Sequence, residues 1–177
     1  MTKSAGFTLT ELMITLAIFG VLVSAAIPSF KQMMTNYQTR VAAESVANGL
    51  SRARAEAVSK NTKVYFALGG GTSWTVDYVT KPVPTDPPLD QRSSSEGSSN
   101  ASIAAVASDL TTAATKITYN NLGQTVANAD ASPTLSQVTV TVSGGTQSLL
   151  IKINPGGSAR MCDPTLPAAN VRSCLHA

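Results

Sequence analysis

The pattern of hydrophobic and polar positions begins with a long apolar segment. Residues 7–27 contain one charged side chain, Glu11. As a helix this segment would be about 31 Å long at ~1.5 Å per residue, which is enough to cross the hydrocarbon core of a bilayer. Lys3 precedes it in a short head without acidic residues, which predicts a cytoplasmic N-terminus. We therefore expect the rest of the chain to lie outside the cytoplasm.

Beyond Pro28 the apolar residues recur at helical spacing, while charged side chains lie mostly off this stripe. The pattern predicts one helix from about Thr8 to Ser59, whose upper half places one face on a sheet. Pro28 removes a backbone donor and Gly20 lowers helix propensity by about 1 kcal/mol, so both loosen the helix. The stripe consists of Phe30, Met33, Met34, Tyr37, Val41, Val46, Leu50, Ala53 and Ala57.

In most of the remaining chain, apolar and polar residues alternate with the two-residue period of strands. Residues 63–68 and 73–79 flank a triple-glycine turn and predict a hairpin, with Trp74 as a core residue. Further strands are expected in four places. The fold class is therefore α+β, with a mainly antiparallel sheet of about five to seven strands on the upper half of the helix. The four places are residues 116–126, with a turn at 121–123, residues 136–142 and 148–153, which flank a Gly-Gly turn as a second hairpin, and residues 158–162.

Residues 81–115 interrupt this pattern. Residues 81–88 contain four prolines, and residues 91–100 are rich in serine, so we expect a flexible segment without regular structure. Residues 101–115 contain enough alanine for either a weak helix or a poorly ordered strand. An excursion of this length inside a domain is usually functional or disordered.

Composition narrows the class of protein. Only 13% of residues are charged and 5% are aromatic, and the formal net charge is +3. This composition is typical of exported β-rich domains and argues against a cytosolic enzyme. The single histidine, His176, and the scattered acidic residues form no nucleophile motif, phosphate loop or metal-ligand set, so we expect no catalytic residues, no metal and no cofactor.

The two cysteines lie near the C-terminus and enclose eleven residues. In an exported chain Cys162 and Cys174 predict one structural disulfide, which stabilises the fold by about 3 kcal/mol through loop closure. A redox site would favour a closer pair of cysteines, and a metal site would need more ligands than two cysteines and His176.

Glu11 is costly in lipid unless it meets a partner. If the chain were cut after Gly6, Phe7 would carry a new amino group close to Glu11. The N-terminus of a neighbouring copy would be an equally good partner, which predicts assembly of packed helices. Two alternatives remain open: a secretory signal cut after the small residues Ser24 to Ala26, and a plain membrane anchor.

Gly6, Phe7 and Glu11, followed by the apolar helix, resemble the class III signal of type IV pilins and pseudopilins. The resemblance implies the type IV pilin fold, cleavage after Gly6 by a prepilin peptidase, N-methylation of Phe7, and a role of Glu11 in assembly. It further implies a leader at 1–6, a transmembrane and assembly helix at 7–30, and a head at 31–177. The head would comprise a helix at 31–60, the flexible segment 81–115, a β-sheet and the Cys loop 162–174.

The head is similar to the H-type group of minor pilins and pseudopilins, the GspH, FimT and FimU types. The segments that carry this resemblance are residues 51–57, the Trp74 hairpin, residues 117–124 and residues 157–162. It implies a minor pilin that joins other major and minor pilins at the inner membrane and its assembly platform, primes assembly, and lies at or near the filament tip. A type II secretion pseudopilin and a major pilin are the alternatives.

Some FimT-type members bind DNA through a C-terminal Gly-Arg-x-Arg motif. Here the matching stretch is Gly157 to Arg160, in which Ser158 replaces the first arginine. Arg160, with Arg172 and Lys152, would make a weak, salt-sensitive contact with phosphates. The alternative is that Arg160 and Arg172 are solvated or pair with an aspartate, Asp163.

Overall fold

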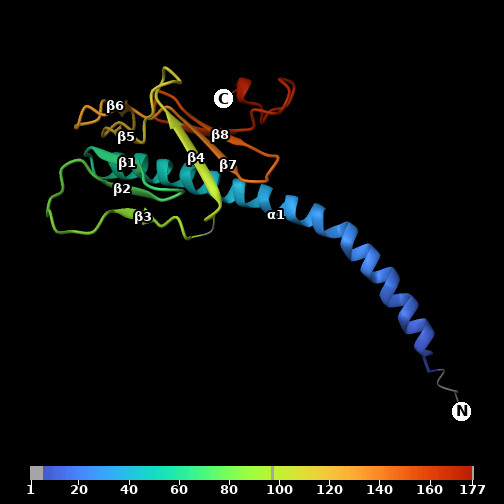
Figure 1. The fold of residues 1–177 in the computed structure, drawn as a ribbon. Helices are drawn as coiled ribbons and strands as arrows, with labels where there is room; N and C mark the ends of the chain where they lie inside the picture. The colour runs from blue at the N-terminus through green and yellow to red at the C-terminus, as the bar shows by residue number, and fades with distance from the viewer. Residues whose placement is uncertain (1–5, 97, 177) are drawn as a thin grey trace, which may run out of the picture. The chain divides into compact units, whose positions relative to one another are not determined.

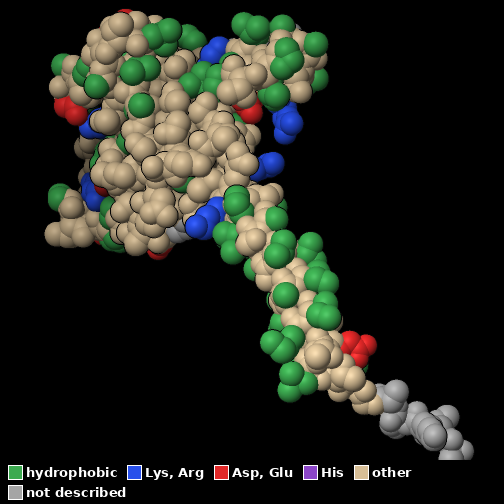
Figure 2. Space-filling model, turned by 45° about the vertical axis from the view of Figure 1, so that its right-hand side comes forward, with side chains coloured by type: hydrophobic (Ala, Val, Ile, Leu, Met, Phe, Trp, Pro, Cys, Tyr) green, Lys and Arg blue, Asp and Glu red, His purple; other side chains and the backbone are tan. Residues whose placement is uncertain are grey.

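The computed structural model describes residues 6–96 and 98–176, which divide into two compact units after Met34. Helix α1, Leu9–Ser59, begins within one residue of the predicted start and ends where predicted. It continues through Pro28. The part of α1 in the first unit is long and apolar enough to cross a membrane, and its hydrophobic side chains are exposed along its length (Figure 2).

Helix α1 ends in a hydrogen-bonded cap that reverses the chain. The backbone of Asn61 has a positive φ of 51°. The N–H of Thr62 donates to the carbonyl of Ala57 at 3.1 Å, and the N–H of Asn61 donates to that of Val58 at 3.3 Å. These are the two bonds of a Schellman cap, in which asparagine tolerates the left-handed position. The cap turns the chain directly into the first strand.

The second unit contains two antiparallel sheets beside the upper part of α1 (Figure 1). The first has the strand order β3-β2-β1-β5-β6 and the second the order β4-β7-β8-β9. The prediction of a single sheet of five to seven strands is therefore wrong, although all pairings within the two sheets are antiparallel. The strands are β1 Val64–Leu68, β2 Trp74–Tyr78, β3 Asp90–Arg92, β4 Ala101–Val106, β5 Lys116–Tyr119, β6 Thr125–Val126, β7 Gln137–Val142, β8 Leu149–Ile153 and β9 Ala159–Cys162, followed by the 3-10 helix η1 Cys174–His176.

The core lies between the upper part of α1 and the sheets. Trp74 is buried, as predicted, and its Nε1–H donates to the hydroxyl of Ser45 in α1 at 2.9 Å. A Cβ at Gly49 would lie 2.7 Å from the ring of Phe66, so this glycine permits the close approach of helix and strand. The helical residues in the core are Thr39, Ala42, Ala43, Ser45, Val46, Gly49, Leu50, Ala53 and Ala57.

The first part of the predicted helix stripe is exposed. Phe30, Met33, Met34 and Tyr37 are exposed, whereas burial begins at Thr39. Helical spacing alone predicts which residues share a face, and it does not predict where along the helix the sheet begins.

Residues 81–115 also differ from the prediction. The segment contains β3, which pairs with β2, and β4, which pairs with β7 over six residues. The expectation of a stretch without regular structure is therefore wrong at residues 90–92. Of the two alternatives for residues 101–115, the strand is present at residues 101–106. Residues 81–88 lie outside helices and strands.

Candidate functional sites

The predicted processing site lies just before α1. Gly6, Phe7 and Thr8 precede the helix, and the side chain of Phe7 is 84% exposed. A Cβ at Gly6 would meet no atom within 4 Å, so nothing in the described chain itself requires glycine there. A requirement for glycine at this position would therefore come from an enzyme that acts on the peptide bond between Gly6 and Phe7. Lys3 and the rest of residues 1–5 lie outside the described residues.

Glu11 takes part in a capping box with Thr8. The hydroxyl Oγ1 of Thr8 accepts from the backbone N–H of Glu11 at 3.3 Å. In return, Oε2 of Glu11 accepts from the backbone N–H of Thr8 at 3.4 Å and from its hydroxyl at 3.3 Å. This reciprocal pattern is typical of Thr-x-x-Glu at the start of a helix. Sequence reasoning overlooked this contact, although the spacing of the two residues contains the signal.

The capping box has two consequences for the carboxylate. It places the negative charge in the first turn of α1, where the helix dipole stabilises an anion. It also uses only one carboxylate oxygen, Oε2, and Oε1 has no hydrogen-bond partner among the described residues. Glu11 is exposed. The arrangement therefore leaves an acceptor that an amino group can reach.

The side chain of Arg54 in α1 forms hydrogen bonds to two separate turns of the head. Its Nε donates to the carbonyl of Gly123 at 2.9 Å, and its Nη2 donates to that of Gly156 at 3.2 Å. Gly157 packs so close to Gly123 that a Cβ on it would overlap the Gly123 carbonyl. Arg54 thus clamps the turn before β6 and the turn between β8 and β9 to the end of α1. The clamp unites residues 51–57, 117–124 and 157–162, three segments that carry the resemblance of the head.

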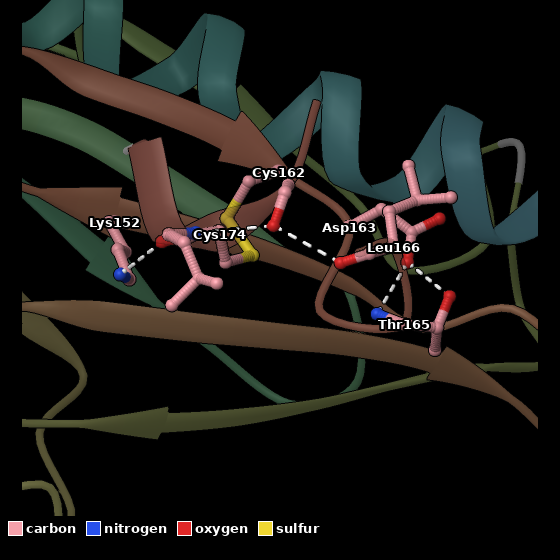
Figure 3. Close-up of a disulfide and its surroundings, with 8 residues drawn as sticks. Lys152, Cys162, Asp163, Thr165, Leu166 and Cys174 are labelled. Atoms are coloured by element: carbon pink, nitrogen blue, oxygen red, sulfur yellow. Dashed lines mark hydrogen bonds between the residues drawn. A yellow bond between two sulfur atoms is a disulfide. The ribbon is translucent and has the colours of Figure 1, made fainter. Parts of the chain in front are cut away.

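The predicted disulfide between Cys162 and Cys174 is present, with a Cα–Cα distance of 4.9 Å (Figure 3). It closes the C-terminal segment onto the end of β9. Lys152 in β8 donates through Nζ to the carbonyl of Cys174 at 2.7 Å, so the loop is also tied to the neighbouring strand. The bridge therefore holds the Cys loop against the second sheet.

Asp163 organises the interior of the Cys loop. Its carboxylate accepts from the backbone N–H of Thr165 at 2.9 Å, from the Thr165 hydroxyl at 2.6 Å and from the side chain of Gln147 at 3.3 Å. Desolvation by burial raises the pKa of Asp163, but these hydrogen bonds and the charge of Arg172 together outweigh it and hold the pKa below its ordinary value. The carboxylate is thus kept ionised as part of the loop.

The three cations of the predicted DNA contact fall into two places. Lys152 and Arg160 are cross-strand partners in β8 and β9 and line one depression. Arg172 lines a different depression, with Arg40 of α1. Arg160 and Arg172 are exposed, whereas Lys152 is half-buried and bound to Cys174. The structure therefore brings together two of the three cations that the sequence suggested.

Comparison with solved structures places this fold beside known pilin subunits. A crystal structure of the type IV minor pilin FimU of Pseudomonas aeruginosa is 19% identical, with a TM-score of 0.55 over 78% of this chain and 96% of that one. A second crystal form of FimU is 18% identical, with a TM-score of 0.50 over 76% of this chain and 98% of that one. The minor pseudopilin EpsH of the Vibrio cholerae type 2 secretion system is 12% identical, with a TM-score of 0.51 over 73% of this chain and 99% of that one. At these identities the likeness shows the fold, which is the type IV pilin fold.

The sequence itself also matches two family descriptions, although no curated protein matches it. Residues 1–27 match the prokaryotic N-terminal methylation motif, which agrees with the class III signal read from Gly6, Phe7 and Glu11. Residues 42–157, most of the chain, match the family of type II transport protein GspH. With its apolar N-terminal helix, its methylation motif and its pilin head, the chain belongs to the GspH family of minor pilins and pseudopilins.

Proposed function

We propose that this chain is a structural minor subunit of a type IV pilus, which enters the filament through residues 7–30 and helps to initiate its assembly at or near the tip. The observation that carries the proposal is the carboxylate of Glu11. It is the only charge in a 21-residue apolar segment, and one of its oxygens has no partner among the described residues. Inside a bilayer or between packed apolar helices, a carboxylate is costly without a partner, and the amino terminus of a neighbouring subunit would supply one.

In this proposal a prepilin peptidase of the inner membrane cuts after Gly6 and methylates Phe7. The capping box joins Thr8 to Glu11, so it lies downstream of the cut and is retained. Before assembly the chain spans the inner membrane once with its head in the periplasm. It then leaves the membrane for the filament, in contact with other major and minor pilins and the assembly platform.

The test is Glu11→Gln. Glutamine also fits the third helical position of a capping box, so the variant removes the charge and keeps the local geometry. We expect Glu11→Gln to accumulate in the membrane fraction at wild-type levels but to be lost from sheared filaments. Thr15→Val is the matched control, because Thr15 lies in the same segment and its hydroxyl donates to the carbonyl of Leu12 in its own helix at 2.8 Å. Filaments that contain Glu11→Gln at the wild-type level would refute the role of the charge.

A pseudopilin of a type II secretion system is the alternative, because EpsH shares the fold and the matched family is described as type II transport protein GspH. Deletion of the gene distinguishes them. We expect loss of surface filaments with unchanged protein secretion. Loss of secreted enzymes with normal filaments would assign the chain to secretion instead.

DNA contact by the head is a further alternative, favoured by the cross-strand placement of Lys152 and Arg160. Two cations predict weak retention of DNA that weakens steeply between low and moderate salt. A gel-shift with the full chain in detergent tests it, with Arg160→Ala and Arg172→Ala as variants. No shift at low salt, or equal shifts from wild type and the double variant, would exclude this role.

A further inference from the structure

Strand β4 forms one edge of the second sheet (Figure 1). On one side it pairs with β7 over its whole length, from Ala101 opposite Val142 to Val106 opposite Gln137. In the described part of the chain, no strand of the sheet lies on its other side. An edge of this kind presents backbone N–H and C=O groups that can pair with another chain.

Among the described residues, the chain itself covers both ends of this edge. At the start, the N–H of Ala101 donates to the carbonyl of Ser98 at 3.0 Å. The N–H of Ala114 donates to the carbonyl of Ala105 at 3.1 Å, and the N–H of Ala107 donates to that of Thr112 at 2.9 Å. The cover then stops, because the carbonyl of Thr115 accepts from the N–H of Leu68 at the end of β1 in the other sheet. The passage of the chain from one sheet to the other therefore leaves the middle of the β4 edge, around Ile103, open.

The open groups can be identified from the alternation of an antiparallel ladder. The carbonyl of Ala105 points away from β7, since it accepts from Ala114, and the carbonyl of Val106 accepts from Ser136 on the side of β7. Residues two apart point to the same side, so the N–H and C=O of Ile103 also point away from β7. Neither has a hydrogen-bond partner within the described part of the chain.

The surroundings of the open groups are uncharged. A groove of about 560 Å³ lies along β4 and is bounded by Leu68, Gly69 and Gly71 at the end of β1 and by residues of the 111–115 segment. None of its lining residues is charged, and no charged residue occurs between Glu96 and Asp109. Natural edge strands are usually protected by lysine, proline or a bulge, and the sequence of β4 contains neither lysine nor proline.

We propose that the open part of the β4 edge, centred on Ile103, is a docking site for an extended, uncharged peptide segment of another protein. The segment adds as a strand beside β4. The site binds the backbone of the segment, because the N–H and C=O of Ile103 are one donor and one acceptor, spaced as in a sheet. Its uncharged character follows from the walls of the groove, where a charged side chain would find no counter-ion among the described residues. The inference does not depend on which filament the subunit joins.

The probe is a fluorescent, capped peptide of alternating valine and threonine, with two terminal lysines for solubility. In its first form the valine nitrogens are methylated, which leaves one hydrogen-bonding edge and prevents the peptide from aggregating. In its second form the valine and threonine nitrogens are all methylated, so the side chains remain but no donor does. We expect the full chain in detergent to bind the first form at least about tenfold more tightly than the second. Equal binding of both forms, or no binding of either up to about 1 mM, would overturn the proposal.

Two matched variants locate the site. Ala104→Lys adds a charge to an exposed position on the edge, and Thr141→Lys adds the same charge to an exposed position on β7, away from the edge. We expect Ala104→Lys to weaken binding of the first peptide at least about tenfold and Thr141→Lys to leave it within about twofold. Equal effects of both variants would contradict an edge site. A dimer of the full chain that Ala104→Lys dissociates in sedimentation would show that a second copy occupies the edge, which would also overturn the proposal.

Discussion

Replacement of Gly157 by alanine should break the junction between the two turns held by Arg54. Gly157 has a φ of 83°, in the left-handed region that side chains disfavour, and a Cβ there would overlap the carbonyl oxygen of Gly123. The turn between β8 and β9 must therefore move away from Gly123. Arg54 bonds to both turns, so it cannot keep both bonds after this movement.

The magnitude follows from these two effects. A left-handed backbone costs a non-glycine residue roughly 1–2 kcal/mol. Loss of one hydrogen bond from the guanidinium of Arg54 costs about 1.5–3 kcal/mol. Gly157→Ala should therefore lower the free energy of unfolding by roughly 2.5–5 kcal/mol, which corresponds to a fall in the unfolding midpoint of about 5–20 °C for a chain of this size.

The assay is thermal unfolding of the purified protein, with Gly156→Ala as the matched control. A Cβ at Gly156 would lie 3.3 Å from Oδ1 of Asn154, a tight contact with one side-chain atom, and its φ lies outside the left-handed region. We expect the control to unfold close to the wild type. An unfolding midpoint of Gly157→Ala within about 2 °C of that of Gly156→Ala would refute the close approach of the two turns.

Three further outcomes are expected. Replacement of Cys162 and Cys174 by serine should cost about 3 kcal/mol through the lost loop closure, and reductant should then have no effect on the unfolding midpoint of the variant. Asp163 has a lowered pKa in the folded state, so its contribution to stability is present above its ordinary pKa of 3.8 and is lost as the pH falls through the lower, folded value. Asp163→Asn should therefore make the free energy of unfolding less dependent on pH in that range. A variant with the same pH dependence as the wild type would contradict this. Gly6→Leu should block processing without loss of folding, because a Cβ at Gly6 would meet no atom of the described chain within 4 Å, and a mature product of normal size on a gel would argue against this.

Local signals predicted the helix well. An unbroken helical pattern predicted the length of α1, and the structure adds that the left-handed backbone of Asn61 closes its end. The hairpins β1–β2 and β7–β8 were likewise predicted from alternation and glycine turns. In each case the pattern and its terminating residue lie close together in the sequence.

Strand β4 and the division into two sheets were not predictable in this way. Residues 101–106 contain three alanines, which have low strand propensity, and β4 exists because it pairs with β7, more than thirty residues later in the chain. Strand β3, which consists of Asp90, Gln91 and Arg92, has no apolar alternation at all and is ordered by its pairing with β2. Tertiary pairing overrides local preference in both strands.

The candidate sites differ in the same way, between residues close together in the sequence and residues far apart in it. Gly6, Phe7 and Glu11 lie within six residues of one another, so their spacing was sufficient to suggest the N-terminal site. Arg54 acts over 69 and 102 residues of sequence, to Gly123 and Gly156, and its clamp became apparent only in the folded head.

The mass of the N-terminal peptide of the protein, isolated from cells that produce it, tests the central claim most directly. The account predicts a peptide that begins at Phe7 and carries one methyl group on its amino nitrogen. A peptide that begins at Ile27, as expected for a secretory signal cut after Ala26, would contradict the account, as would an uncut chain that begins at Met1.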